Sequence, residues 1–499
     1  MTASHPWYAL LALLAACGAV MGVLLASLPL PEALLVLTLA VTGVTSLLEP
    51  LAGLGVALLI GPLWAWLIVF PYVPPLIGQY LFLLVVAIWL VRGAAHREIA
   101  FPIHALLPPL LLFMGAALLS LWNPVDTRYG FNEFGKWGQI ALISVLVYER
   151  IRGEAGARRV PLAVGGLALA AVFQAGLGIY QFALRGTGPA PFAIGEGLYR
   201  AYGTFQQPNP FAGFLGMVGA VLVGLALSEG GAWLWRWWRE RAWPARAAGL
   251  RLGAVMLAAF LVSGAVGASW SRGAWVGYAA ALLGMAALLP RRGWWGVLLV
   301  GALVLTGAFL YQGGWLPGGI AARLMGFAEY FRFRDVRGVG INDANYAAIE
   351  RMAHWQAAIE MWRANFWFGV GLGGYPPAYP AYRLINWPLD LGHAHNYYLN
   401  LLAEVGLLGF LAYAFLMGRA LWLTVSATRR RDGWARGLAL GLTGAWIHLA
   451  MHSLVDTLLV NNVHLHIGVL LALSAWVGDA HGEYFKTQAK CVGVIKRGA

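Results

Sequence analysis

The stretch GHAHNYYLNLLAEVGLLGFLAYAFLMGRALWLTV, residues 392–425, holds the two features on which the interpretation of the whole chain depends. Its first five residues are mostly polar. From Tyr397 onward it forms an apolar run long enough, as a helix, to cross a hydrocarbon layer about 30 Å thick. Similar runs recur along the chain, so the sequence predicts an all-α polytopic membrane protein. The alternating pattern of a membrane β-barrel is absent from the sequence.

The composition supports this class. Of the 499 residues, 60% are hydrophobic and 11% are charged, and the mean hydropathy is +0.69. Soluble domains usually carry about 25% charged residues. The only two cysteines are Cys17, in the first apolar run, and Cys491, in the C-terminal tail, so we expect no disulfide framework.

We predict about fourteen membrane spans, or twelve if the short second and third runs form one broken element. The chain would then comprise an N-terminal transmembrane scaffold (1–198), central transmembrane helices with arginine motifs (199–312), a large external, partly helical loop (313–396), C-terminal transmembrane helices (397–478) and a cytoplasmic tail (479–499). The apolar runs lie at about 7–28, 33–48, 51–70, 76–91, 104–121, 136–148, 160–184, 208–228, 252–269, 273–289, 294–312, 397–425, 434–456 and 463–478.

Basic residues occupy every second connection between these spans. By the positive-inside rule these connections and both termini are cytoplasmic. Topology therefore explains the net charge of +13, and we expect membrane lipids but no nucleic acid as partners. The Trp- and Arg-rich segment 233–243 is interpreted as an interfacial anchor rather than an RNA-binding segment. The basic positions are Arg92, Arg97, Arg150, Arg152, Arg158, Arg159, Arg236, Arg239, Arg241, Arg246, Arg251, Arg291, Arg292, Arg429, Arg430, Arg431 and Arg436, with further basic residues in the tail.

Further basic residues, Arg323 among them, are predicted on the opposite side and lack this topological reason. Three arginines stand out there by their context. Arg200 lies in a loop that leads into a span, Arg272 lies in a short connection between two spans, and Arg351 lies early in a helical pattern over residues 347–364. Guanidinium groups match phosphate oxygens in a bidentate way, so we predict that they bind a lipid-linked diphosphate. For each one, snorkelling to the interface or a plain surface position is the alternative.

The loop that carries Arg200 is rich in turn-forming residues. Gly203, Pro208 and Pro210 predict a tight, non-helical approach of the chain to the bilayer.

The polar residues before the apolar run at 397–425 place imidazoles at the end of a span. His393 or His395 there would suit proton transfer at a membrane surface. Alternatively, the pair His395–Asn396 simply caps the helix that follows, which carries Glu404.

A second histidine group lies near the last two spans. His448, His452 and Asp456 follow at intervals of four residues, and His464 and His466 come soon after. The interval of four places two imidazoles on one helical face, as a metal site requires. We favour a buried polar network that fixes helix packing, because Asp456 can pair with His452 without a metal.

Taken together, these motifs resemble those of the O-antigen ligase family, which are integral-membrane glycosyltransferases related to the O-antigen polymerases. His395–Asn396, nine residues and then Gly406-Leu-Leu-Gly409 are similar to that family's His-Asn/Ser/Gln, nine, Gly-x-x-Gly signature. The N-terminal spans match only in hydropathy. The other similar segments are the arginine motif at 271–275, the Arg…Gly…Asn loop at 199–209, and Arg351 with the glycine-rich segment 369–375.

The resemblance implies a GT-C-like transmembrane helical bundle with residues 313–396 as an external cap. It implies transfer of a glycan from an undecaprenyl-diphosphate carrier to an acceptor hydroxyl, without a metal or another cofactor, at the periplasmic face of the bacterial inner membrane. Carried onto this chain, His395 would be the general base, with His393 as its nearby competitor. Arg200, Arg272 and Arg351 would bind the diphosphate, Arg272 also acting in catalysis, and the supporting residues would be Asn209, Asn396, His393 and Glu404.

The sequence leaves the acceptor open. A lipid A core sugar would make the protein a ligase of lipopolysaccharide biosynthesis, the growing glycan would make it a polysaccharide polymerase, and a Ser or Thr side chain would make it a protein O-oligosaccharyltransferase. The alternative of another class is a solute transporter, which the gathering of candidate residues at one face disfavours.

Overall fold

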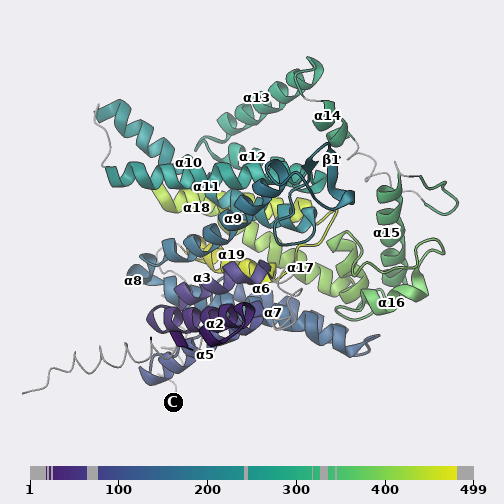
Figure 1. Ribbon diagram of the computed structural model, residues 1–499, viewed down its shortest axis with the longest axis horizontal. Coiled ribbons are helices and arrows are strands. Elements are labelled where there is room, and N and C mark those ends of the chain that lie inside the picture. Colours follow the sequence, from purple (N-terminus) through teal and green to yellow (C-terminus); the bar gives the residue numbers. More distant parts are fainter. Residues whose placement is uncertain are drawn as a thin grey trace, which may run out of the picture.

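The computed structural model describes residues 18, 22–23, 26–63, 77–240, 246–316, 318–325, 335–342 and 345–479. Within them the chain is almost entirely helical, which confirms the all-α class (Figure 1). The helices are α2 (Leu30–Leu48), α3 (Pro50–Ile60), η1 (Gly61–Leu63), α5 (Ile77–Ala95), α6 (Leu107–Ser120), α7 (Thr127–Ile151), α8 (Gly153–Ala157), α9 (Val160–Ala183), η2 (Ala190–Phe192), α10 (Pro208–Glu240), α11 (Arg246–Ala268), α12 (Arg272–Leu288), α13 (Gly293–Gln312), α14 (Gly318–Met325), α15 (Tyr346–Ala364), α16 (Tyr375–Tyr382), α17 (Tyr397–Arg430), α18 (Gly433–His452) and α19 (Val463–Gly478). Two short antiparallel strands, β1 (Ala193–Gly195) and β2 (Leu198–Tyr199), precede α10.

Seven helical segments in the described part of the chain are long and apolar enough to cross a membrane, so this is an integral membrane protein. They are α2, α5, α8 with α9, α10, α11, α13 and α17. Four shorter apolar segments accompany them: α3 with η1, α6, α12 and α19. The predicted run at 7–28 falls almost wholly outside the described residues, as do residues 64–70 of the third run and the tail from residue 480. A count of fourteen or twelve spans therefore stays a prediction.

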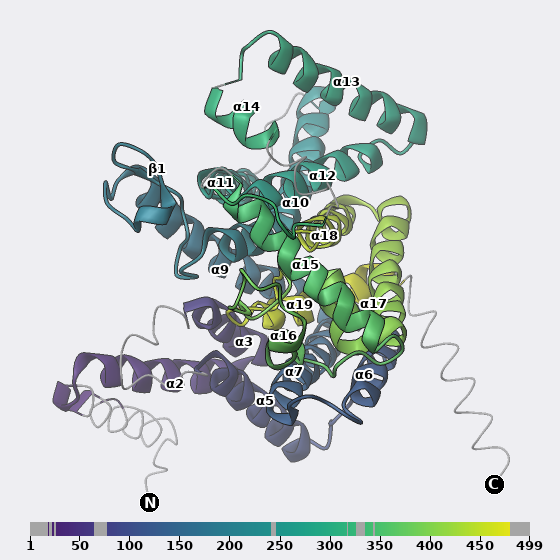
Figure 2. The same cartoon turned by 90° about the vertical axis from the view of Figure 1, so that its right-hand side faces the viewer.

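Glycines allow α10, α12 and α18 to approach closely in the middle of the bundle, where Figure 2 shows them side by side. A methyl group added at Gly441 of α18 would meet the backbone of Val221 on α10. One added at Gly277 of α12 would meet the His448 carbonyl of α18. Small residues at helix crossings are the usual solution in a membrane, because lipid surroundings provide no hydrophobic drive between helices.

Two of the arginine-rich connections that we expected on the cytoplasmic side meet at one end of the bundle. Arg429 donates to the Pro290 carbonyl at 2.8 Å, and Arg436 donates to the Leu289 carbonyl at 2.6 Å. These bonds hold the α12–α13 connection against the α17–α18 connection. We call this end of the bundle the basic end.

The entry to α10 differs in one respect from the sequence prediction. The tight turn occurs, because Gly203 has a φ of +54°. The expected non-helical approach through Pro210 is wrong, since the helix already begins at Pro208. Proline suits a first helical turn, where the backbone N–H has no intrahelical partner to lose.

α17 is broken at Gly406, whose φ of +63° and ψ of −167° are not helical. Segment 366–371, in the loop that we predicted to be external, fills the break. The Val370 N–H donates to the Ala403 carbonyl at 2.8 Å, and the Leu407 N–H donates to the Phe366 carbonyl at 2.9 Å. A side chain at Gly406 would overlap this segment's backbone, so the break requires glycine.

Candidate active site

A tight turn before α17 presents two imidazoles together. Asn396 is the N-cap of α17, and its side chain accepts from the N–H groups of Tyr398 and Leu399 at 3.1 Å each. The capping interpretation is thus confirmed for Asn396. His395 has a φ of +51°, a conformation that costs energy in a non-glycine residue and is often found at functional sites. The His393 ring accepts from the His395 N–H at 3.0 Å, and the two rings lie 4.3 Å apart.

The carboxylate of Asp456 lies against both imidazoles. Its Oδ1 is 3.8 Å from Nδ1 of His395 and 3.9 Å from Nε2 of His393. The Thr457 N–H donates to the same oxygen at 2.9 Å and so helps to orient it. Nδ1 of His395 is buried and has no hydrogen-bond partner among the described residues. The carboxylate is therefore the nearest group that can orient the His395 ring.

This arrangement corrects part of the second histidine group. α18 ends at His452, so Asp456 follows the helix and does not continue its face. Among the described residues, the group of side chains that could hold a metal ion is instead His393, His395 and Asp456, whose ligand atoms lie within 4.8 Å of one another. His464 lies elsewhere, with its Nε2 2.9 Å from the side-chain oxygen of Gln139.

α15 places a third imidazole beside the pair. His354 lies with its ring 5.8 Å from that of His395, it bonds the Tyr375 hydroxyl at 2.8 Å, and it stacks on Tyr379. Burial lowers the pKa of His354 to about 3, and His395 and His393 add to this effect. His354 is therefore neutral at physiological pH. We did not single it out from the sequence, although it lies one helical turn after Arg351 and so on nearly the same face.

Arg351 lies within electrostatic reach of the turn that carries His393 and His395, which we call the histidine turn. Burial lowers the pKa of His393 to about 4; His395 and the Arg351 guanidinium contribute, while Asp456 opposes the shift. The predicted helix around Arg351 is confirmed as α15. The neutral His393 imidazole can accept a proton, and the Arg351 guanidinium supplies a positive charge for an anionic ligand.

The two arginine loops predicted from the sequence meet each other. Arg200 donates through Nε to the Ser269 carbonyl at 2.9 Å and through a terminal nitrogen to Asn209 at 3.2 Å. Asn209 also accepts from the Ser271 hydroxyl at 2.9 Å. Arg200 and Asn209 therefore hold the connection 269–271, which leads directly into Arg272 at the start of α12.

A further arginine supports the same connection. Arg323 of α14 donates twice to the Trp270 carbonyl, at 3.1 and 2.9 Å. Sequence reasoning placed Arg323 among the outward arginines without a particular role. Only the fold shows that α14 returns to this connection.

The start of α12 packs beside the segment that carries Asp456. A methyl group added at Gly273 would meet Val455, and the His452 ring lies just beyond. Arg272 therefore directly precedes Gly273, which contacts Val455, and Val455 directly precedes Asp456. The structure brings the connection 269–271 and the histidine turn to the same end of the bundle, opposite the basic end.

Glu404 is joined to the histidine turn through Asn400, whose side chain bonds Glu404 and also accepts from the Ala394 N–H at 3.1 Å. Its carboxylate accepts from the Tyr375 N–H at 3.2 Å and so ties the start of α16 to α17. The contact is structural, and it holds the external loop that carries the histidine turn.

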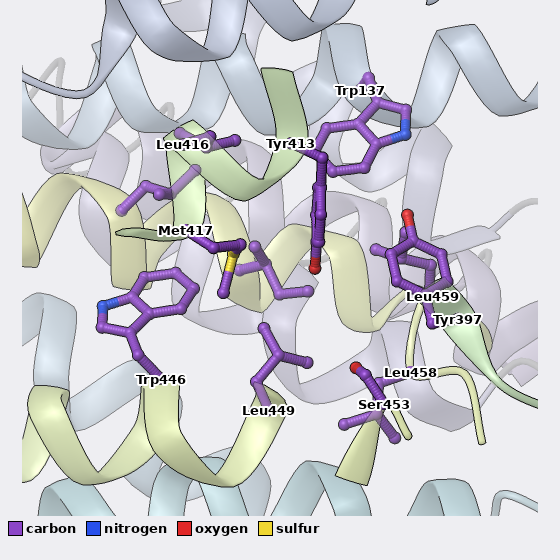
Figure 3. A pocket seen from close by; sticks show the side chains of 12 residues that line it. Trp137, Tyr397, Tyr413, Leu416, Met417, Trp446, Leu449, Ser453, Leu458 and Leu459 are labelled. Atoms are coloured by element: carbon purple, nitrogen blue, oxygen red, sulfur yellow. The ribbon is translucent and has the colours of Figure 1, made fainter. Parts of the chain in front are cut away.

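Figure 3 shows the side chains that line a small apolar cavity, among them Tyr397, which directly follows His395 and Asn396. Tyr397 and Ser453 lie on its wall, and the Tyr397 N–H donates to the Ser453 carbonyl at 2.8 Å. Apart from hydroxyl groups, the lining offers nothing for proton transfer. The candidate site is therefore the polar cluster next to the cavity. The other lining residues are Trp137, Tyr413, Leu416, Met417, Trp446, Leu449, Leu458, Leu459, Ile467 and Leu471.

Residues 256–414 match the family model described as O-antigen ligase. The chain carries an O-antigen ligase domain. This confirms the resemblance seen in the sequence motifs and indicates an enzyme of the glycosyltransferase or ligase type. The O-antigen ligase domain contains Arg272, Arg351 and the histidine turn, whereas Arg200 and Asp456 lie outside the matched residues. No curated protein matches the chain.

Proposed function

We propose that this protein transfers a glycan from an undecaprenyl-diphosphate carrier to an acceptor hydroxyl at the outer face of the bacterial inner membrane. One observation carries the proposal. His395, which belongs to the O-antigen ligase domain, lies 3.8 Å from Asp456, at the end of the bundle where the connection before Arg272 packs. A base and a cation thus share the region where a lipid-linked diphosphate would present its sugar.

His395 is the general base in this proposal. With Nδ1 facing Asp456, Nε2 is the nitrogen that takes the proton of the acceptor hydroxyl. The acceptor oxygen then forms a bond to the anomeric carbon as the bond from that carbon to the diphosphate oxygen breaks. The carboxylate stabilises the imidazolium that results, and His393 shares the same carboxylate.

The bond that breaks leaves its electron pair on the diphosphate. Arg272 and Arg351 bind this group and stabilise the charge that develops on it. Arg200 has donors engaged with Ser269 and Asn209, so its main contribution is to position the connection that precedes Arg272. Direct contact of Arg200 with the diphosphate stays a prediction.

The proposed reaction needs no metal ion. His393, His395 and Asp456 are ligand types that Zn²⁺ accepts. However, their nitrogen–oxygen separations of 3.8 and 3.9 Å are longer than the roughly 3.3 Å expected around a shared tetrahedral ion. The charge of Arg351 near His393 also disfavours a cation.

The proposal is tested with purified protein in liposomes that contain an undecaprenyl-diphosphate-linked glycan. A lipid A core glycolipid, a free glycan and a Ser/Thr peptide are offered separately, and the one that becomes extended identifies the protein as ligase, polymerase or protein transferase. His395→Gln should lower the rate by about 10²–10⁴-fold, the usual contribution of a general base. The matched control is His96→Gln, an exposed histidine near the start of the α5–α6 connection, which should keep the full rate. Full transfer by His395→Gln would exclude this base.

A further inference from the structure

The external segment between α15 and α16 carries three consecutive aromatic residues on the molecular surface. Phe366, Trp367 and Phe368 are 40%, 56% and 47% exposed. Their backbone is fixed in the break of α17, where the Leu407 N–H donates to Phe366 at 2.9 Å and the Leu408 N–H donates to Trp367 at 3.3 Å. A rigidly held apolar patch of this kind marks an interaction surface.

The height of this patch in the bilayer follows from α17. After the break, residues 407–430 extend roughly 36 Å at 1.5 Å per residue. Their far end carries Arg429 and Arg430 at the basic end of the bundle. A hydrocarbon core about 30 Å thick therefore places Leu408 and the three aromatic residues near the opposite boundary of the bilayer.

A second pair of helices gives the same height independently. Trp122 follows α6, and Phe131 lies in the second turn of α7; both side chains are exposed. From Phe131, α7 runs roughly 28 Å at 1.5 Å per residue to Arg150. This end of α7 lies at the basic end, because the Tyr148 hydroxyl donates to Asp479 at 2.9 Å and Asp479 also accepts from Arg431. The Val125 N–H, between the two aromatic residues, donates to the Val370 carbonyl at 3.2 Å, which joins this pair to the external segment.

We propose that Trp122, Phe131, Phe366, Trp367 and Phe368 form an aromatic rim that inserts into the lipid interface of the leaflet opposite the basic end. Large aromatic rings favour the level between headgroups and acyl chains. The lipid-facing side chains of α17 begin directly below the rim, so the surface continues one already in contact with lipid. Those side chains include Leu411 and Phe415.

The rim gives the external loop a fixed height over the membrane. Segment 366–371 leads through α16 to the histidine turn, and it is bonded both to α17 and to the α6–α7 connection. The inference rests on exposure and helix lengths, so it holds whether or not the proposed reaction is correct.

The test measures depth with one probe at a time in the full-length protein. The chain has only two cysteines, so Cys17→Ala and Cys491→Ala provide the background. Trp367→Cys is labelled with bimane in phosphatidylcholine liposomes and quenched either by nitroxide-labelled lipids or by aqueous iodide. Leu411→Cys is the lipid reference. Ile341→Cys, an exposed apolar residue near the exposed Asp335–Arg337 ion pair, is the water reference.

We expect lipid quenching at position 367 comparable to that at position 411, strongest for a nitroxide near the headgroup, with iodide quenching at least threefold weaker than at position 341. Iodide quenching equal to that at position 341 would overturn the proposal and favour a surface for a water-borne ligand such as a glycan. Protection from both quenchers would also overturn it, because the patch would then be covered by protein.

A glycine substitution tests the link between the rim and the break. Gly406→Ala should expel segment 366–371 and raise iodide quenching at position 367 at least twofold. Gly418→Ala in the same helix, where an added methyl group meets nothing within 4 Å, should leave it unchanged. If Gly406→Ala does not fold, the depth measurement above decides alone. An unchanged depth in a folded Gly406→Ala protein would contradict the role of the break.

Discussion

At both ends of the bundle, arginines bond backbone carbonyls. The histidines behave differently, and this contrast between the two residue types shows which side chains mark a site. At the basic end, Arg436 donates hydrogen bonds to the carbonyls of Thr428 and Leu289, and Arg431 donates one to the carbonyl of Val477. Basic side chains near the C-terminus of a helix commonly satisfy such carbonyls. Arginine at a helix end is therefore explained by structure alone in many places.

At the opposite end, arginine again bonds carbonyls, whereas several imidazole nitrogens in the described part of the chain have no hydrogen-bond partner. Arg200 and Arg323 hold the carbonyls of the 269–271 connection, as the arginines do at the basic end. In the described part of the chain, the buried Nδ1 of His395 has no hydrogen-bond partner, and both ring nitrogens of His452 are likewise buried without one. Leaving buried polar atoms unpaired is costly, so these imidazoles, more than the number of arginines, distinguish this end.

The largest expected effect comes from the carboxylate beside His395. Asp456→Asn keeps the shape but removes the charge that orients and stabilises the imidazole, so transfer should fall by about 10²-fold or more. The measurement is the initial rate of glycan transfer in liposomes across a range of pH. Asp432→Asn, which alters the ion pair with Arg291 at the basic end, should keep the rate. Equal losses in both variants would remove the contrast between the ends.

A smaller effect is expected from Arg272→Lys. Lysine keeps the charge but loses the bidentate fork, so the KM for the lipid-linked donor should rise by about tenfold. Arg292→Lys in the α12–α13 connection is the matched control and should change nothing. An unchanged KM in Arg272→Lys would indicate that Arg272 contacts only protein.

At the basic end the effect should fall on stability alone. Arg436→Met keeps the aliphatic stem and removes the bonds to Thr428 and Leu289. We expect Tm in detergent to fall by several degrees, from the loss of about 1–3 kcal/mol. The kcat of the protein that remains folded should stay as in the unaltered chain, and a loss of kcat would mean that the two ends are coupled.

A still smaller effect concerns acid pH. Because the pKa of His354 is lowered to about 3, the unfolded chain binds its proton more readily than the folded one. The stability that neutral His354 provides is complete above pH 6.5 and declines as the pH falls toward 3. Between pH 7 and pH 4.5, Tm should therefore drop a few degrees less for His354→Gln than for the unaltered chain. His96→Gln serves as the exposed control, and identical slopes for His354→Gln and the unaltered chain would contradict the assignment.

Metal removal should have no effect on transfer. Treatment with a chelator, followed by assay in metal-free buffer, should leave the rate of the unaltered chain unchanged. A loss that Zn²⁺ restores would show that His393, His395 and Asp456 form a metal site, and the histidine would then not be a free base.

Much of the molecule could be predicted from local patterns. Apolar runs predicted helices because a chain in lipid must satisfy its own backbone hydrogen bonds. The motifs at Arg200, Arg272 and His395 were visible as residue types that fit neither lipid nor topology. The span expected from about residue 208 begins there, but Pro208 and Pro210 belong to its first helical turn and not to the non-helical approach, because proline also suits a first helical turn.

The sequence by itself determined the membrane class, most helices and the residue types suited to proton transfer and diphosphate binding. Only the tertiary structure decided that Asp456 faces His395 and not the helical face of His452, that Arg200 and Arg323 hold the connection before Arg272, and that residues 366–371 fill the break at Gly406. The physical reason is that local patterns reflect the solvent around each segment. Contacts between separate helices depend instead on where each helix ends and on how closely glycines allow neighbours to approach.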